Sequence, residues 1–226
     1  MKKFAGWTAA AILCAAACAW RVPGGSATAA AKPATLRLVQ ENLALELTFD
    51  DRTKVVVTTK PTPIAPGAHT VKAARLMKQD DKKRTWELRI DGDFSTLATL
   101  TVEEEQDKVI DAGEPILYDC FVWVTGKSSP RDKDVLLRVT AYGKYSEIYY
   151  PGACLGTKKP PPPAWKVTAE DGRVFGQGQF ASPDTGGRVS VTFKAPKDYT
   201  GKVKVELAPT MGPFEWKYRN QEHQLK

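Results

Sequence analysis

The segment Leu43-Ala44-Leu45-Glu46-Leu47-Thr48-Phe49 decides the fold class, because apolar residues occupy every second position. Successive side chains of a β-strand point to opposite faces, so the pattern predicts a strand with one buried and one solvated face. The same alternation recurs along the chain, at residues 85–91, 98–103, 135–142, 189–193 and 203–207. No long stretch has the period of an amphipathic helix. The sequence therefore predicts an all-β protein.

Two further segments refine this prediction. Residues 117–125 are apolar on both faces, which indicates a central strand, and we interpret Trp123 as a core residue together with Trp86 and Trp216. Asp171-Gly172 separates strands expected at 165–170 and 173–180. It predicts a hairpin, because glycine accepts the positive φ that a tight turn requires.

The strands are numerous enough for two tandem antiparallel β-sandwich domains. About seven of them fall within roughly a hundred residues of the second half, the dimensions of an immunoglobulin-like sandwich. We expect a small β-sandwich domain at 36–112, an immunoglobulin-like domain at 113–218 and a polar tail at 219–226, with the boundary near Gly113. The alternative is one continuous sandwich of about thirteen strands.

The first thirty residues have the pattern of a secretory signal peptide. Basic Met1-Lys2-Lys3 precedes an uncharged apolar run, Phe4 to Trp20, and small residues follow. That run is marginal in length for a spanning helix. Cleavage after an A-x-A pattern is expected at Ala19, Ala29 or Ala31. We therefore expect residues 1–30 to be removed and the mature chain, without a membrane span, to be secreted or to lie in the periplasm or cell envelope.

Two alternatives for this leader stay open. The run is also compatible with an uncleaved N-terminal anchor. Ala15-Ala16-Ala17-Cys18 resembles a bacterial lipobox, which would place a lipid anchor on Cys18.

The basic excess of the chain comes partly from this leader. The full chain has a net charge of +7, and loss of Lys2, Lys3 and Arg21 leaves 30 basic and 26 acidic residues, a net charge of +4. Nucleic-acid binding requires clustered cations that follow the phosphates. Here the basic residues alternate with apolar and acidic ones, so we expect no nucleic-acid partner.

Two cysteines, Cys120 and Cys154, remain after the leader. An oxidising compartment favours a disulfide between them. The alternative is a pair of unpaired buried thiols, which pack like small apolar side chains. The chain has no C-x-x-C motif, and only His69 and His223 could assist a metal. We therefore expect neither a metal site nor a cofactor.

A search for catalytic groups identifies none. There is no G-x-S-x-G motif, and the acidic runs lack the spacing and glycine of a calcium loop, so we interpret them as solvated turn charges. We interpret His69 as a surface or edge residue and His223 as part of the polar tail. A hydrolase would need converging carboxylates, for which Asp119 near Glu147 is the candidate pair.

One loop has the composition of a binding surface. Tyr149-Tyr150 and Lys158-Lys159 precede the stiff segment Pro160–Pro163. Aromatic faces stack on sugar rings and dominate protein hot spots, so an exposed platform here would contact a glycan or a protein. The alternative is a rigid crossing between two sheets that ends where Trp165 enters the core.

Two stretches resemble known families. Thr62–Val71 resembles the turn-plus-strand signature of PEGA-type and transthyretin-like (carboxypeptidase regulatory-like) extracellular domains. The second half is similar to secreted bacterial β-sandwich domains that have not been characterised, through Pro160–Trp165, Glu170-Asp171-Gly172 and Pro209–Trp216. The resemblance implies an exported β-sandwich and no known activity.

We conclude that the sequence favours a non-catalytic exported β-sandwich protein, active in protein interaction, adhesion or envelope assembly. The partner would be a protein or a glycan outside the cytoplasm. A carbohydrate-binding module is the alternative, and it requires solvent-facing aromatic residues in a row. An unrecognised hydrolase or hydrolase accessory domain is the third hypothesis.

Overall fold

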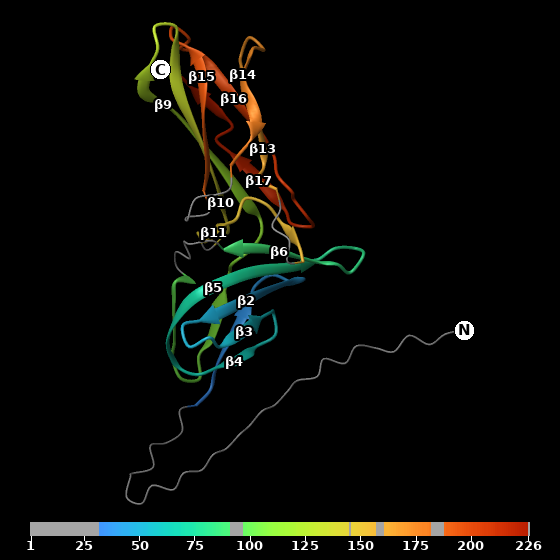
Figure 1. Cartoon of the computed structure of the whole chain (residues 1–226). Coiled ribbons are helices and arrows are strands. Elements are labelled where there is room, and N and C mark those ends of the chain that lie inside the picture. Colours follow the sequence, from blue (N-terminus) through green and yellow to red (C-terminus); the bar gives the residue numbers. More distant parts are fainter. Residues whose placement is uncertain (1–31, 91–96, 145, 157–160, 182–187, 226) are drawn as a thin grey trace, which may run out of the picture. The chain divides into compact units, whose positions relative to one another are not determined.

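The computed structural model (Figure 1) describes residues 32–90, 97–144, 146–156, 161–181 and 188–225. In these residues the protein is all-β, as the alternation predicts, and contains no α-helix. The predicted signal peptide lies outside the described residues, and so do Lys158 and Lys159. Residues 31–226 form one compact unit. No helix in the described part of the chain has the length and apolar character needed to cross a membrane.

The strands form three sheets. The smallest has three strands in the order β4 (Thr62–Ile64), β1 (Ala34–Leu38), β8 (Asp107–Ile110). A four-stranded sheet has the order β14 (Val174–Gln179), β13 (Ala164–Ala169), β16 (Lys202–Ala208), β18 (Glu222–Gln224).

The third sheet has eleven strands and contains segments from both sides of Gly113. Its main path is β17 (Trp216–Arg219), β9 (Ile116–Ser128), β10 (Asp132–Tyr142), β11 (Ile148–Tyr149), β6 (Thr85–Ile90), β5 (Gly67–Gln79), β2 (Leu43–Phe49), β3 (Lys54–Val57). Three strands attach beside this path: β15 (Val189–Pro196) on β10, β12 (Cys154–Leu155) on β6 and β7 (Thr99–Val102) on β5.

Two strand pairs are parallel, so the expectation of purely antiparallel sheets is wrong for them. β1 pairs in parallel with β8, and β17 pairs in parallel with β9. The other pairs are antiparallel, as in the β13–β14 hairpin, where Gly172 has φ of 85°. Alternation of apolar residues identifies a strand and its buried face but carries no information on the direction of its neighbour.

The neighbouring strands confirm which face of β2 is buried. Leu45 and Leu47 are fully buried and face the same side as Leu76 and Leu88. On the other face Glu46 accepts two hydrogen bonds from Arg75, at 3.1 and 2.9 Å between the nitrogen and oxygen atoms. These bonds lower the pKa of the Glu46 carboxyl, so this solvated face is made of ionised groups that bond one another.

A second part of the core lies between β9, β10 and β15 on one side and β13, β14 and β16 on the other. Val139 and Val167 are fully buried, and the Trp165 ring lies 6.2 Å from that of Phe193 between centroids. A Cβ atom on Gly176 would come within 2.8 Å of the Trp165 ring. Glycine at this position therefore lets the tryptophan lie against β14, and the entry of Trp165 into the core is confirmed.

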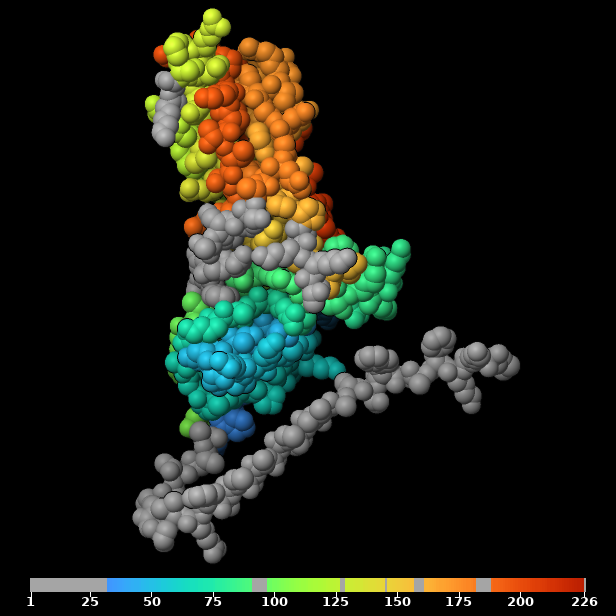
Figure 2. Space-filling view, viewed as in Figure 1, coloured from blue at the N-terminus to red at the C-terminus, as the bar shows by residue number. Residues whose placement is uncertain are grey.

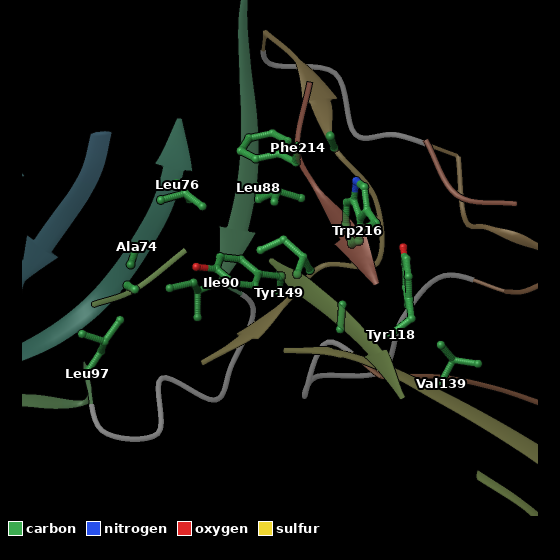
Figure 3. Close-up of a cluster of buried hydrophobic side chains, with 14 of the residues drawn as sticks. Ala74, Leu76, Leu88, Ile90, Leu97, Tyr118, Val139, Tyr149, Phe214 and Trp216 are labelled. Atoms are coloured by element: carbon green, nitrogen blue, oxygen red, sulfur yellow. The ribbon is translucent and has the colours of Figure 1, made fainter. Parts of the chain in front are cut away.

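The buried residues form one continuous cluster across Gly113 (Figure 3). Tyr149 pairs with Ile90 of β6, while Tyr118 stacks on Trp216 at 4.8 Å between ring centroids. Within the segment expected to be a polar tail, Glu222–Gln224 form β18, which pairs with β16, and Leu225 is buried. The division into domains at 36–112 and 113–218 stays a prediction.

Candidate functional site

The outer face of β9 and β10 carries large apolar side chains in contact with solvent. Phe121 is 42% exposed and Trp123 is 39% exposed. Across the ladder Phe121 pairs with Arg138, and Trp123 pairs with half-buried Leu136. We call these four residues the aromatic strip.

The strip exists because alternate residues of each strand face opposite ways. Cys120 on β9 and Leu137 and Val139 on β10 are fully buried on the inner face. The strip residues between them must therefore face outward. On the inner face, Phe193 of β15 packs against Trp165 of the four-stranded sheet, whereas Phe121 and Trp123 on the outer face stay exposed.

A cation–π contact organises the strip. The Arg138 guanidinium lies over the Trp123 ring, with its carbon 5.1 Å from the ring centroid. Such contacts orient both side chains and contribute about 0.5–1 kcal/mol at exposed sites. Among the residues that the structure describes, Arg138 forms no ion pair. Its positive charge is therefore available to an acidic group of a partner.

The two acidic residues beside the strip already have partners. Asp134 forms an ion pair with Lys194 of β15. Asp119 accepts a hydrogen bond of 2.7 Å from the Asn220 amide. The surface thus has an aromatic and aliphatic centre with one unpaired cation, bordered by two acidic residues that have partners, which resembles the composition of a protein interface.

The exposed platform expected at Tyr149 and Tyr150 is corrected by the structure. Tyr149 is fully buried and Tyr150 is 4% exposed, so neither ring is available to a ligand. Tyr149 belongs to β11, which is paired on both sides, with Ala141 of β10 and with Ile90 of β6. Lys158 and Lys159 lie outside the described residues.

A buried carboxylate is the hydrogen-bond partner of the Tyr149 hydroxyl. Its hydroxyl donates to Glu147 Oε1 at 2.5 Å, and the Gly113 amide donates to the same oxygen at 3.1 Å. Burial first and the Glu147 charge second raise the pKa of Tyr149 well above its ordinary value. A Cβ atom on Gly143 would overlap the Glu147 carboxylate, so glycine is required there. Glu147 is fully buried, so this cluster is structural.

The two remaining cysteines form no disulfide with one another in the structure. Cys120 is an unbridged thiol on β9 opposite Val139, whereas Cys154 lies on β12 opposite Glu87. Both are buried, which corresponds to the alternative of packed thiols. Burial, with a smaller effect of Asp119, raises the pKa of Cys120 to about 12 and keeps it protonated.

The other candidate groups are used locally. His69 is half-buried, and its Nε2 lies 2.7 Å from the Ala65 carbonyl oxygen. Asp80 lines a hollow of about 520 Å³ at the β5–β6 turn. It accepts hydrogen bonds from the Trp86 indole and from Arg84, which hold its pKa well below the usual range. Asp119 and Glu147 have different partners and form no carboxylate pair.

No cluster of three or more metal-ligating side chains occurs within the described ranges. The only signal for the aromatic strip in the sequence was an apolar residue at every position from Phe121 to Val124. This run predicts a strand buried on both faces, which is wrong for Phe121 and Trp123. An arginine beside apolar residues in the partner strand, as in Leu136-Leu137-Arg138, would have indicated a solvated outer face.

Comparisons with known proteins identify no relative. No family model matches the chain, and neither a curated protein nor a solved structure matches it. The resemblances to PEGA-type, transthyretin-like and immunoglobulin-like domains therefore stay predictions.

Proposed function

We propose that the chain is a non-catalytic, exported binding protein that recognises another protein through the aromatic strip. The observation that carries the proposal is the exposure of Phe121 and Trp123 side by side on one sheet face with Arg138. Tryptophan, aromatic and arginine side chains supply most of the energy at protein interfaces. Export rests on the basic n-region, the apolar run and the A-x-A sites of residues 1–31.

The partner surface is defined by the chemistry of the strip. It has an apolar patch that receives the two rings and Leu136, and a carboxylate that reaches Arg138. A glycan is the second candidate, because two aromatic side chains in a row on a flat strand are suited to stacking on sugar rings. The protein partner is favoured because Arg138 already occupies one face of the Trp123 ring.

A photo-crosslinking amino acid placed at Phe121 in cells tests the proposal. We expect a discrete adduct with one protein, which mass spectrometry identifies. The matched control is the same amino acid at Val56, an equally exposed apolar residue on β3, where that adduct should be absent. Trp123→Ala should weaken binding of the identified partner by about 2 kcal/mol or more, roughly 30-fold.

Two results would contradict this proposal. The same adducts at Phe121 and Val56 would show that the strip has no special role. Retention of an insoluble polysaccharide that is lost in Trp123→Ala, with no protein adduct at Phe121, would establish the glycan alternative instead.

A further inference from the structure

The strand β14 forms an open edge of the four-stranded sheet. It pairs with β13 on one side only, and no described strand pairs with its other side. Gln177, Gly178 and Gln179 are exposed, so the backbone of this edge is in contact with solvent. In Figure 2 the orange atoms of this region lie on the molecular surface.

Hydrogen-bond alternation shows which backbone groups point to the open side. The Phe180 amide donates to the Pro163 carbonyl at 3.1 Å. By the register of the ladder, the backbone N–H and C=O groups of residues 180, 178 and 176 therefore point toward β13. In an antiparallel ladder the residues between them direct their N–H and C=O groups away. The backbone groups of Gln177 and Gln179 therefore face the open edge.

This edge lacks the features with which proteins prevent edge-to-edge pairing. Charged residues and prolines are the usual protection. Six of the other described edge strands have them: Lys54 in β3, Pro63 in β4, Lys108 in β8, Lys194 in β15, Lys217 in β17 and Glu222 in β18. Of the described edge strands without charge or proline, β14 is the longest, with six residues against four in β7 and two in β12.

The edge is also complementary to itself. Two copies of β14 running antiparallel about a two-fold axis place no like charges opposite each other. A glutamine amide both donates and accepts hydrogen bonds, so it matches an identical side chain, which a lysine or a glutamate does not. The glycines that flank Gln177 face the Trp165 ring on the inner side of the sheet, so the side chains beside the outward backbone groups are those of Gln177 and Gln179.

We infer that the protein forms a two-fold dimer in which β14 of one copy pairs with β14 of a second copy. Reciprocal bonds between the outward backbone groups of Gln177 and Gln179 join the two four-stranded sheets into one eight-stranded sheet. The contact is separate from the aromatic strip, which lies on β9 and β10, and does not depend on the proposed function.

Sedimentation velocity on the purified chain tests the inference over about 1–300 µM, a range suited to a small interface. We expect the mass to rise from one chain to two as concentration increases. Gln177→Lys places like charges at the contact, and Gln177→Pro removes an outward N–H that β13 does not use. Both should abolish the dimer and leave the thermal midpoint of the monomer unchanged.

The matched control is Thr101→Lys. Thr101 is an exposed residue of β7, a four-residue edge strand that also lacks charge and proline. This variant should leave the dimer intact. A second measurement needs no variant: hydrogen exchange at the Gln177 and Gln179 amides should slow as concentration rises. A monomer at every concentration, or a dimer that survives both Gln177 variants, would overturn the inference. A monomer that instead binds an extended peptide along β14 would overturn it in favour of a heterologous partner.

Discussion

Tyr149 of β11 and Trp123 of β9 belong to the same eleven-stranded sheet, yet Tyr149 is fully buried and Trp123 is 39% exposed. Both are aromatic, and both lie on strands paired on two sides. They differ in what lies over the ring. Tyr149 points into the continuous core beside Glu147, whereas Trp123 points away from the sheet that covers β9.

Cover by a second layer therefore decides whether an aromatic side chain is structural or available for binding. In the core, the polar end of Tyr149 must find a partner, and it does so on Glu147 at 2.5 Å. On the outer face Trp123 needs no such partner, and its ring is held by Arg138. Three experiments test this difference, in order of decreasing effect on stability.

Tyr149→Ala and Trp123→Ala form a matched pair of truncations. Tyr149→Ala removes a buried ring and leaves a cavity next to a carboxylate, so we expect a loss of about 3–5 kcal/mol in the free energy of unfolding. Trp123→Ala should change it by less than about 1 kcal/mol. Urea denaturation of both variants measures the difference. Equal losses would show that the two rings are equally part of the core.

Tyr149→Phe separates the hydroxyl from the ring. The ring still fills its space, but Glu147 Oε1 loses the donor at 2.5 Å and keeps the Gly113 amide at 3.1 Å. We expect a loss of about 1–3 kcal/mol, the cost of depriving a buried acceptor of its partner. The same denaturation series provides the measurement, and stability equal to the native chain would show that the bond contributes nothing.

Labelling of Cys120 tests the inward face of the strand that carries the strip. Because burial raises the pKa of Cys120 to about 12, its thiol should resist iodoacetamide at pH 8 in the native state. After denaturation without a reductant, peptide mapping should find Cys120 and Cys154 both alkylated, because no disulfide joins them. A Cys120–Cys154 linked peptide, as the export hypothesis favours, would contradict the structure.

The sequence was sufficient for the strands whose two faces differ. The alternation from Leu43 to Phe49 predicted both the strand and its inward leucines, and Asp171-Gly172 predicted the β13–β14 turn. Neither parallel pair could be predicted, because both join segments far apart in the chain, as in β1 with β8.

The candidate site was predicted in the wrong place for a related reason. The hypothesis of an exposed platform at Tyr149 and Tyr150 fails because their environment depends on β6, which lies about sixty positions earlier. Conversely, the apolar run predicts that Phe121 and Trp123 are buried. An apolar run does not indicate which of its two faces a second sheet covers. Local patterns specify strands, whereas layering depends on contacts between distant segments.

The parallel pairing of β17 with β9 also constrains when this protein can fold. Trp216 stacks on Tyr118, so a ring near the middle of the chain acquires its cover from a residue about a hundred positions later. A growing polypeptide on the ribosome therefore exposes Tyr118 and one edge of β9 until its last strands have been synthesised. Such distant pairing slows folding, so Tyr118 and this edge of β9 are covered only at a late stage.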